Sequence, residues 1–231
     1  MKRIVVFLLL AAPAYGQFDQ ARWELVKRVV GQFEVLLLKS RAATGSSGLG
    51  DPMYDVDVLV RDGSSTLYEY TTPPHGQDSV APVYFVDDDL ELRDVTGDGV
   101  PEVLFHAGFA GASDSVTEEH VLHYDPAGRR MVDVRDPAFS NSGTHGFRWL
   151  TVGKQVFGVV AVRNWPARVA EEDRCHYCLS PFRYVIYEWN PARRSFTVRR
   201  QIDGRKEFEM AGEALDAEWD FLRRTLRPGR N

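Results

Sequence analysis

A loop near the middle of the chain has the residue types and the spacing to bind a hard cation. Its oxygen-bearing side chains, at positions 1, 3, 5 and 9 of residues 94–102, belong to Asp94, Thr96, Asp98 and Glu102. Between them, Gly97 and Gly99 allow the positive φ angles that a backbone needs to wrap around a cation. The loop therefore predicts one cation site, and an Asp/Gly-rich turn that binds no ion is the alternative.

The residues that follow decide which type of cation loop this is. An EF-hand requires a bidentate Glu at position 12 and a following helix, but position 12 here is Phe105. The run Val103–Phe105 is apolar, as expected of a buried strand. An EF-hand is therefore excluded. The pattern D-x-x-x-D-G-x-x-E between two strands instead resembles the calcium loop of FG-GAP and VCBS-type repeats, which occur in β-propellers and in many exported bacterial proteins.

This resemblance implies that Ca²⁺ is bound by the side chains of Asp94, Thr96, Asp98 and Glu102 and by the carbonyl of Val100. Two residues depart from the family pattern, because Thr96 replaces a carboxylate or amide and Glu102 replaces the usual Asp. Fewer charged ligands lower the affinity, so we expect a dissociation constant of roughly 0.1 to 1 mM, as in extracellular modules. The ion would be structural rather than catalytic.

The chain contains two cysteines, Cys175 and Cys178, in the sequence Cys-His-Tyr-Cys. Attachment of a c-type haem would require histidine at position 179, which is leucine. Zinc would need two further ligands, and no βαβ pattern indicates a thioredoxin-like redox motif. Because the chain is predicted to reach an oxidising compartment, we predict a disulfide, with zinc binding and redox activity as the alternatives.

No residue can be assigned a catalytic role from the sequence. The patterns G-x-S-x-G and H-E-x-x-H and a phosphate-binding loop do not occur. His120 and His123 would point to opposite faces of a strand, so we expect these residues and His106 to be exposed or hydrogen-bonded rather than shared ligands. A carboxylate pair for glycoside hydrolysis is an alternative that the sequence leaves open.

The rest of the chain predicts a mainly β protein built from antiparallel meanders. Alternating or apolar runs joined by turn residues indicate hairpins. The paired runs are 54–61 with 66–70, 120–124 with 130–134, 147–152 with 156–162, and 183–189 with 195–199. At most three blade-like units can be recognised, fewer than the four to eight that close a propeller. We therefore expect an open blade-like or sandwich-like arrangement.

Two of the predicted hairpins have similar turns. Asp125 and Asn190 each begin an Asx-Pro-Ala turn between aromatic-rich strands, at an offset of 65 residues. The similarity indicates either a degenerate repeat of one meander or two independent hairpins that use common turn residues.

Short helices are predicted at both ends of the mature chain. Residues 18–33 place Trp23, Val26, Val30 and Phe33 at helical intervals, and residues 212–226 place four apolar side chains on one helical face. Before them, residues 1–16 have the basic start, the apolar run and the Ala-Tyr-Gly end of a signal peptide. Residues 17–231 are therefore predicted to form a single exported domain, periplasmic or secreted.

The composition narrows the class of partner. The chain has 33 acidic and 28 basic residues, and removal of Lys2 and Arg3 would increase the acidic excess, which argues against nucleic acid. The apolar run of the signal peptide is shorter than the roughly 20 residues that cross a bilayer, so we expect no membrane span. A protein or a glycan is then the predicted ligand.

These observations favour a non-catalytic binding or structural module of the cell envelope or extracellular space. The first alternative is a secreted hydrolase with an acidic site at Asp87–Asp89 and Asp94. The second is an inhibitor or chaperone of another exported protein, acting through the basic hairpin around Arg193 and Arg194. We expect a hydrolase to have a deep pocket with paired titratable groups and a module to bind through a flat or convex face.

Overall fold

The computed structural model describes residues 18–46, 52–73, 83–86, 89–110, 115–142, 145–165 and 178–227. The predicted signal peptide, residues 1–16, lies outside the described residues, as do Asp87, Asp88 and Cys175. Most of the described chain forms antiparallel strands, which confirms the prediction of a mainly β fold.

The strands form three main sheets, and the main path of each sheet follows the order of the chain. Sheet 1 contains β1 (Trp23–Val30), β2 (Glu34–Ser40), β5 (Val56–Asp62) and β6 (Ser65–Thr71). Sheet 2 contains β7 (Val83–Val86), β8 (Glu91–Arg93), β9 (Glu102–Ala110), β10 (Ser115–Asp125), β11 (Arg130–Asp133) and β12 (Ser140–Asn141). Sheet 3 contains β13 (His145–Val152), β14 (Gln155–Arg163), β15 (Ser180–Asn190) and β16 (Ser195–Phe208). The short strands β3 (Gly45–Ser46) and β4 (Pro52–Met53) pair separately.

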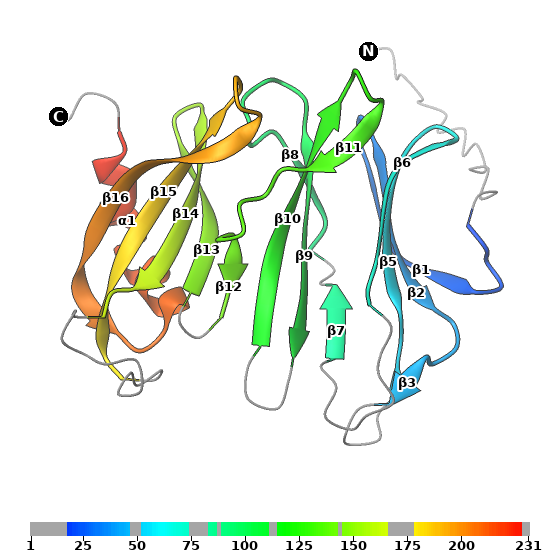
Figure 1. Cartoon of the computed structure of the whole chain (residues 1–231), viewed down its shortest axis with the longest axis horizontal. Helices are drawn as coiled ribbons and strands as arrows, with labels where there is room; N and C mark the ends of the chain where they lie inside the picture. Colours follow the sequence, from blue (N-terminus) through cyan, green and yellow to red (C-terminus); the bar gives the residue numbers. More distant parts are fainter. Residues whose placement is uncertain are drawn as a thin grey trace, which may run out of the picture.

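Sheet 2 is buried on both faces because it lies between the other two sheets (Figure 1). Alternate residues of β9 point to opposite faces. Phe105 joins a core cluster with Leu37 of sheet 1, whereas Leu104 joins a cluster with Val160 and Phe196 of sheet 3. Two apolar interfaces therefore hold the three sheets in a row, in agreement with the predicted open arrangement, blade-like or sandwich-like.

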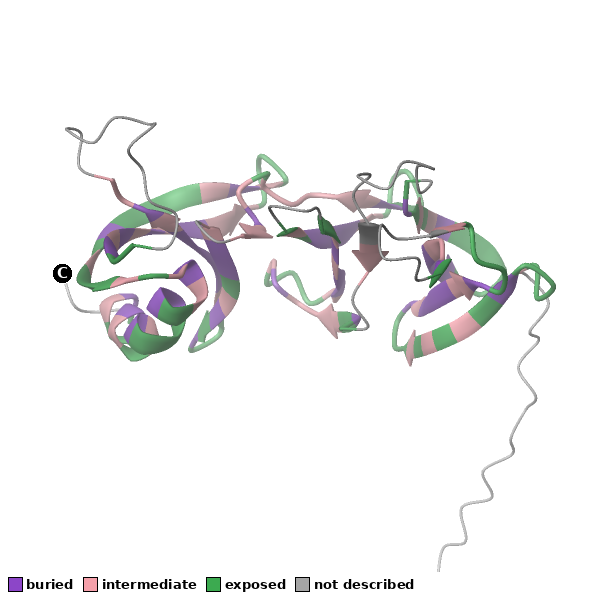
Figure 2. Cartoon of the chain, turned by 90° about the horizontal axis from the view of Figure 1, so that it is seen from below, coloured by how far each residue is buried: buried purple, intermediate pink, exposed green. Residues whose placement is uncertain are grey.

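Helix α1 (Ala211–Thr225) covers sheet 3, and it lies at the opposite end of the row from sheet 1 (Figure 2). Leu215 and Leu222 are buried in this interface, as the apolar stripe in the sequence predicts. The buried carboxylate of Glu218 accepts a hydrogen bond of 2.9 Å from the Tyr184 hydroxyl and one of 3.0 Å from the Arg205 amide. The predicted C-terminal helix is confirmed.

The predicted N-terminal helix over residues 18–33 is wrong, because Trp23–Val30 form strand β1. Pairing with β2 satisfies the backbone of this segment and places it beside a buried strand, and this tertiary context overrides the helical spacing of its apolar residues. A register shift between Leu25 and Lys27 reverses the alternation of side chains along β1. The apolar side chains before and after the shift therefore point to opposite faces of the sheet. Val26 and Val30 are 50% and 65% exposed, whereas the helix would have buried them.

The two similar Asx-Pro-Ala turns occupy equivalent places in sheets 2 and 3. They join β10 to β11 and β15 to β16, and Arg129 and Arg194 adopt φ angles of 48° and 50° at matching positions. The Arg194 guanidinium also donates to Asp125 Oδ1 at 3.2 Å, which connects the two turns. The two turns therefore share one geometry, which both a degenerate repeat of one meander and two independent hairpins with common turn residues would give.

One buried carboxyl group lies in sheet 1. Asp57 is 4% exposed, and among the described residues its Oδ1 atom has no hydrogen-bond partner. Burial, reinforced by the neighbouring Glu69 carboxylate, raises the pKa of Asp57 to about 7. The folded protein therefore retains a proton on Asp57 at pH values where the unfolded chain has released it.

We expect the free energy of unfolding to fall as the pH rises from about 4 to about 8, because ionised Asp57 is disfavoured only in the folded state. Asp57→Asn mimics the neutral form and should raise the free energy of unfolding at about pH 8 by roughly 1 to 2 kcal/mol. Urea unfolding at about pH 5 and about pH 8 measures this, with Asp62→Asn at an exposed position as the control. An unchanged pH dependence in Asp57→Asn would contradict the assignment.

Candidate functional site

The loop between β8 and β9 is shaped by its own side chains and by two glycines. Gly97 and Gly99 have φ angles of 79° and 88°, in the left-handed region that the sequence predicts for them. The two carboxylate oxygens of Asp94 accept hydrogen bonds from the amides of Gly97 and Gly99, at 2.6 and 3.0 Å. The exposed Asp98 carboxylate accepts one of 2.8 Å from the Val100 amide. These bonds give the loop a defined curvature.

Glu102 fastens the loop to the core of sheet 2. Its side chain is fully buried, and its Oε2 atom accepts a hydrogen bond of 2.8 Å from the Val95 amide. Its Oε1 atom accepts one of 3.0 Å from the Thr96 hydroxyl and lies 3.0 Å from Nδ1 of His123 on β10. Burial raises the pKa of Glu102, and the hydrogen bonds from His123 and the Val95 amide oppose this shift.

The structure assembles part of the predicted cation site and adds one residue to it. Within the described part of the chain, the possible ligand atoms of Asp98, Glu102 and His123 lie within 4.8 Å of one another, and Asp94 does not belong to this group. The sequence did not indicate His123 because its contact with Glu102 joins residues 21 positions apart. An imidazole nitrogen beside two carboxylates suits transition metals, whereas calcium prefers oxygen ligands alone.

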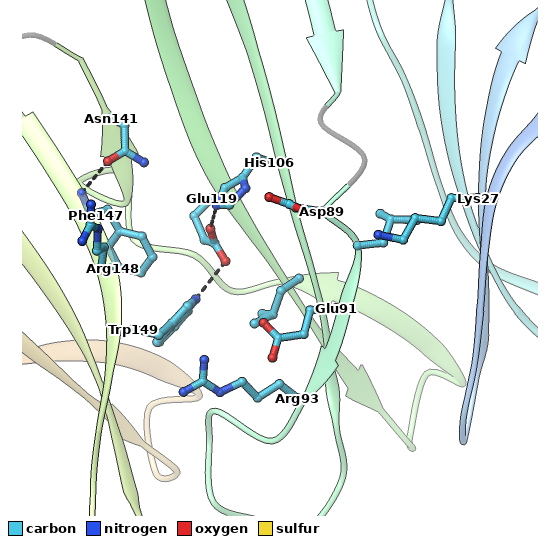
Figure 3. A pocket seen from close by; sticks show the side chains of 12 residues that line it. Lys27, Asp89, Glu91, Arg93, His106, Glu119, Asn141, Phe147, Arg148 and Trp149 are labelled. Atoms are coloured by element: carbon cyan, nitrogen blue, oxygen red, sulfur yellow. Dashed lines mark hydrogen bonds and ion pairs between the residues drawn. The ribbon is translucent and has the colours of Figure 1, made fainter. Parts of the chain in front are cut away.

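An open cleft of about 590 Å³ lies between the three sheets (Figure 3). This central cleft is lined by Lys27, Asp89, Leu90, Glu91, Arg93, Leu104, His106, Glu119, Asn141, Phe147, Arg148 and Trp149. Strand β1 contributes Lys27, β8 contributes Glu91 and Arg93, and β13 contributes Arg148 and Trp149. No local motif contains these residues, so the sequence could not reveal the cleft.

A buried carboxylate with two fixed neighbours forms the middle of the central cleft. Glu119 on β10 is 2% exposed, and its Oε1 atom accepts a hydrogen bond of 2.8 Å from Nε1 of Trp149. Its Oε2 atom pairs with Nε2 of His106, whose side chain is 30% exposed. Figure 3 shows the carboxylate between the imidazole and the indole. The expectation that His106 is hydrogen-bonded is confirmed.

Two arginines of the central cleft are each held by another residue. Arg148 pairs with Asp216 of α1, so the helix that covers sheet 3 also positions a group in the cleft. Nη2 of Arg93 donates to the Thr151 hydroxyl at 2.7 Å, which ties β8 to β13. These contacts connect the cleft to sheets 2 and 3 and to the C-terminal helix.

The two described acidic residues of the hydrolase hypothesis, Asp89 and Asp94, lie in different places. Asp89 lines the central cleft together with Glu91, and both are exposed. Asp94 belongs to the loop and not to the cleft lining. Asp87 and Asp88 lie outside the described residues.

The two histidines of β10 face opposite sides of sheet 2, as predicted. His120 stacks on Phe105, with ring centroids 4.5 Å apart, and its Nδ1 atom lies 2.8 Å from Asp133. His123 contacts Trp189 of sheet 3 through its ring, at 5.2 Å. They therefore do not share a ligand.

Two other predicted features can be placed only in part. Cys178 is disulfide-bonded, and Cys175, the other cysteine of the sequence, lies outside the described residues. In the basic C-terminal hairpin, Arg199 and Arg205 pair with Glu188 and Glu218. Within the described ranges, no helix has the length and apolar character needed to cross a membrane.

Comparisons with known proteins do not identify a family. No family model matches the chain, and no curated protein matches it. A solved structure entitled "Crystal structure of CarG" is similar over 56% of this chain and 90% of that chain, with 12% sequence identity and a TM-score of 0.44. A likeness at this level carries no conclusion about function, and the resemblance of the loop to FG-GAP and VCBS-type repeats stays a prediction.

The role of Glu102 predicts a specific loss of stability. Glu102→Ala would leave the Val95 amide and His123 without their buried partner, so we expect the free energy of unfolding to fall by roughly 2 to 4 kcal/mol. Asp98→Ala removes an exposed carboxylate from the same loop and should cost less than about 1 kcal/mol. Urea unfolding without added metal measures both, and equal losses would contradict the role of Glu102 as the anchor.

Proposed function

We propose that this protein is an exported, non-catalytic binding module whose ligand occupies the central cleft and whose Asp94–Glu102 loop is stabilised by a divalent cation. The observation that carries the proposal is that β1, β8 and β13, from three different sheets, each contribute side chains to one cleft. Side chains on packed strands hold a binding geometry better than side chains on loops. The export step of the proposal rests on the sequence of residues 1–16.

The arrangement of Glu119 supports binding rather than catalysis. A general base needs an oxygen or nitrogen atom within reach of a substrate proton. Both carboxylate oxygens of Glu119 already have partners, Trp149 and His106, and the side chain is almost completely buried. The carboxylate therefore orients the two rings that line the cleft.

A hydrolase is the second candidate, and one observation favours it. A module was expected to present a flat or convex face, whereas the structure has a cleft that contains a pair of titratable groups, His106 and Glu119. A buried carboxylate that holds a partly exposed imidazole can orient it as a general base. The exposed carboxylates of Asp89 and Glu91 line the same cleft.

Calcium is the cation that the loop sequence predicts, and the donor set supports it in part. Asp98 and Glu102 converge as oxygen donors, and the curvature at Gly97 and Gly99 suits a cation loop. His123 adds a nitrogen donor, which Zn²⁺ or Mn²⁺ would use more readily. When bound, the ion would neutralise two neighbouring carboxylates and hold the loop against β10.

Cation binding predicts a rise in stability that depends on Asp98. At a dissociation constant of ~0.1 to 1 mM, about 5 mM Ca²⁺ should raise the free energy of unfolding by roughly 1 to 2 kcal/mol relative to chelator. Thermal melts with Ca²⁺, Mn²⁺ or Zn²⁺ measure this in the wild type and in Asp98→Asn, with Asp62→Asn as the matched control. A melting temperature that no cation changes would remove the cation from the proposal.

Ligand binding in the central cleft can be separated from hydrolysis by one comparison. A thermal-shift screen of sugars, short peptides and nucleotides should identify ligands that raise the melting temperature of the wild type. The double variant Asp89→Ala/Glu91→Ala should bind these ligands at least about fivefold more weakly. Ligands that stabilise both proteins equally would place the binding site elsewhere. Mass spectrometry of each ligand after incubation should show no product, and a product that disappears in Glu119→Gln would favour the hydrolase.

A further inference from the structure

We infer that the central cleft is a saccharide site that binds a short, uncharged oligosaccharide. This inference rests on the proposed function, because it names the ligand class of the same cleft. It is carried by three features of the lining: a fixed aromatic ring, charged groups of both signs in equal number, and hydrogen-bond donors and acceptors that lie close together.

The fixed aromatic ring is Trp149. Its Nε1 atom donates to buried Glu119, and its ring packs edge to face against Phe147, with centroids 5.0 Å apart and an interplanar angle of 86°. Phe139 and Phe196 also contact the ring, with centroids 5.6 and 5.5 Å away. The ring is half-buried and lines the cleft, so only its surface on the cleft side is accessible to a ligand. A rigid, amphipathic indole is a suitable platform for the apolar C–H face of a sugar ring, since it loses little conformational freedom on binding.

The charges of the cleft argue against a strongly charged ligand. Glu119 is paired with His106, and Arg148 is paired with Asp216. The other charged groups of the lining are two cations, Lys27 and Arg93, and two carboxylates, Asp89 and Glu91, so the lining carries both signs of charge in equal number. A further full charge on the ligand would therefore gain little Coulomb energy and would have to lose its own hydration. A ligand with many polar groups and no formal charge avoids this cost.

The remaining hydrogen-bonding groups of the cleft include both donors and acceptors. Asn141, whose Oδ1 atom already accepts from the Phe147 amide, presents amide N–H groups, and Arg93 has five N–H donors, of which one bonds Thr151. Asp89 and Glu91 present carboxylates, which only accept when ionised, and Glu91 lies beside Arg93 on strand β8 (Figure 3). A hydroxyl group donates and accepts at once. Neighbouring hydroxyls of one ligand can therefore satisfy both kinds of group, whereas ionised phosphates only accept and ammonium groups only donate.

The size of the cleft sets the length of the ligand. A volume of about 590 Å³ lies within the range of pockets that enclose small organic ligands, roughly 300 to 1,000 Å³. The cleft is also open, so the ends of a longer chain can extend into solvent. A short oligosaccharide, bound along its length rather than at one end, fits both observations.

Isothermal titration calorimetry on the full mature chain tests this inference. The uncharged probes are cellotriose, maltotriose and N,N′-diacetylchitobiose, and the charged probes are trigalacturonate, triglycine and tripolyphosphate. We expect at least one uncharged sugar to bind with a dissociation constant below about 1 mM. Asp89→Ala and Glu91→Ala, at exposed positions, should each weaken it about fivefold, which corresponds to the loss of about one hydrogen bond. Asp62→Ala, an exposed carboxylate outside the cleft, is the matched control and should bind as the wild type does.

The outcomes separate this inference from the proposed function. If no uncharged sugar binds at about 20 mM while a charged probe binds and is weakened by Asp89→Ala, the saccharide assignment is wrong and the cleft remains a binding site. If sugars bind but neither cleft variant weakens them, both the assignment and the site are wrong. If no probe of either class binds, the saccharide assignment is overturned. A sugar that binds the wild type and is weakened by both cleft variants supports it.

Discussion

Burial of both faces of sheet 2 is the constraint on which the other features depend. Phe105 and Leu104, adjacent residues of β9, are 0% and 2% exposed and point into different core clusters. A sheet that is apolar on both faces must be covered on both, so sheets 1 and 3 lie on either side of it. That order brings residues of β1, β8 and β13 to the lining of one cleft. The cleft is thus a consequence of how the core is arranged.

Buried carboxylates connect the parts of this arrangement that apolar contacts do not fix. Glu102 holds the loop, Glu119 holds the rings in the cleft, and Glu218 holds α1 against sheet 3. Each is at most 2% exposed and accepts at least two hydrogen bonds or ion pairs. A carboxylate is costly to bury without partners, and its hydrogen bonds require a defined geometry. Such groups therefore fix the orientation of the elements that they join, where apolar packing would tolerate several orientations. Asp57 differs from these three groups because, among the described residues, one of its carboxylate oxygens has no hydrogen-bond partner, and burial together with the neighbouring Glu69 carboxylate raises its pKa to about 7.

The features that could be predicted from the sequence are those set by local spacing. The hairpins, the C-terminal helix and the positive φ angles of Gly97 and Gly99 follow from neighbouring residues, and the structure agrees with them. The N-terminal helix was wrong because pairing with β2, a non-local interaction, decided the conformation of Trp23–Val30. His123 and the central cleft were missed for the same reason, since their contacts join strands that are far apart in the sequence.

The Asp94–Glu102 loop directly follows a strand whose residues line the cleft, so β8 positions both part of the cleft and one end of the loop. Arg93, the last residue of β8, lines the cleft, and Asp94, the next residue, begins the loop. Only three residues long, β8 is held by its pairing with β9 and by the bond from Arg93 to Thr151. If the proposed cation stabilises this loop, it does so at one end of the strand that carries Glu91 and Arg93. By linkage, any effect of the cation on the ligand affinity of the cleft would be matched by an equal effect of the ligand on the cation affinity.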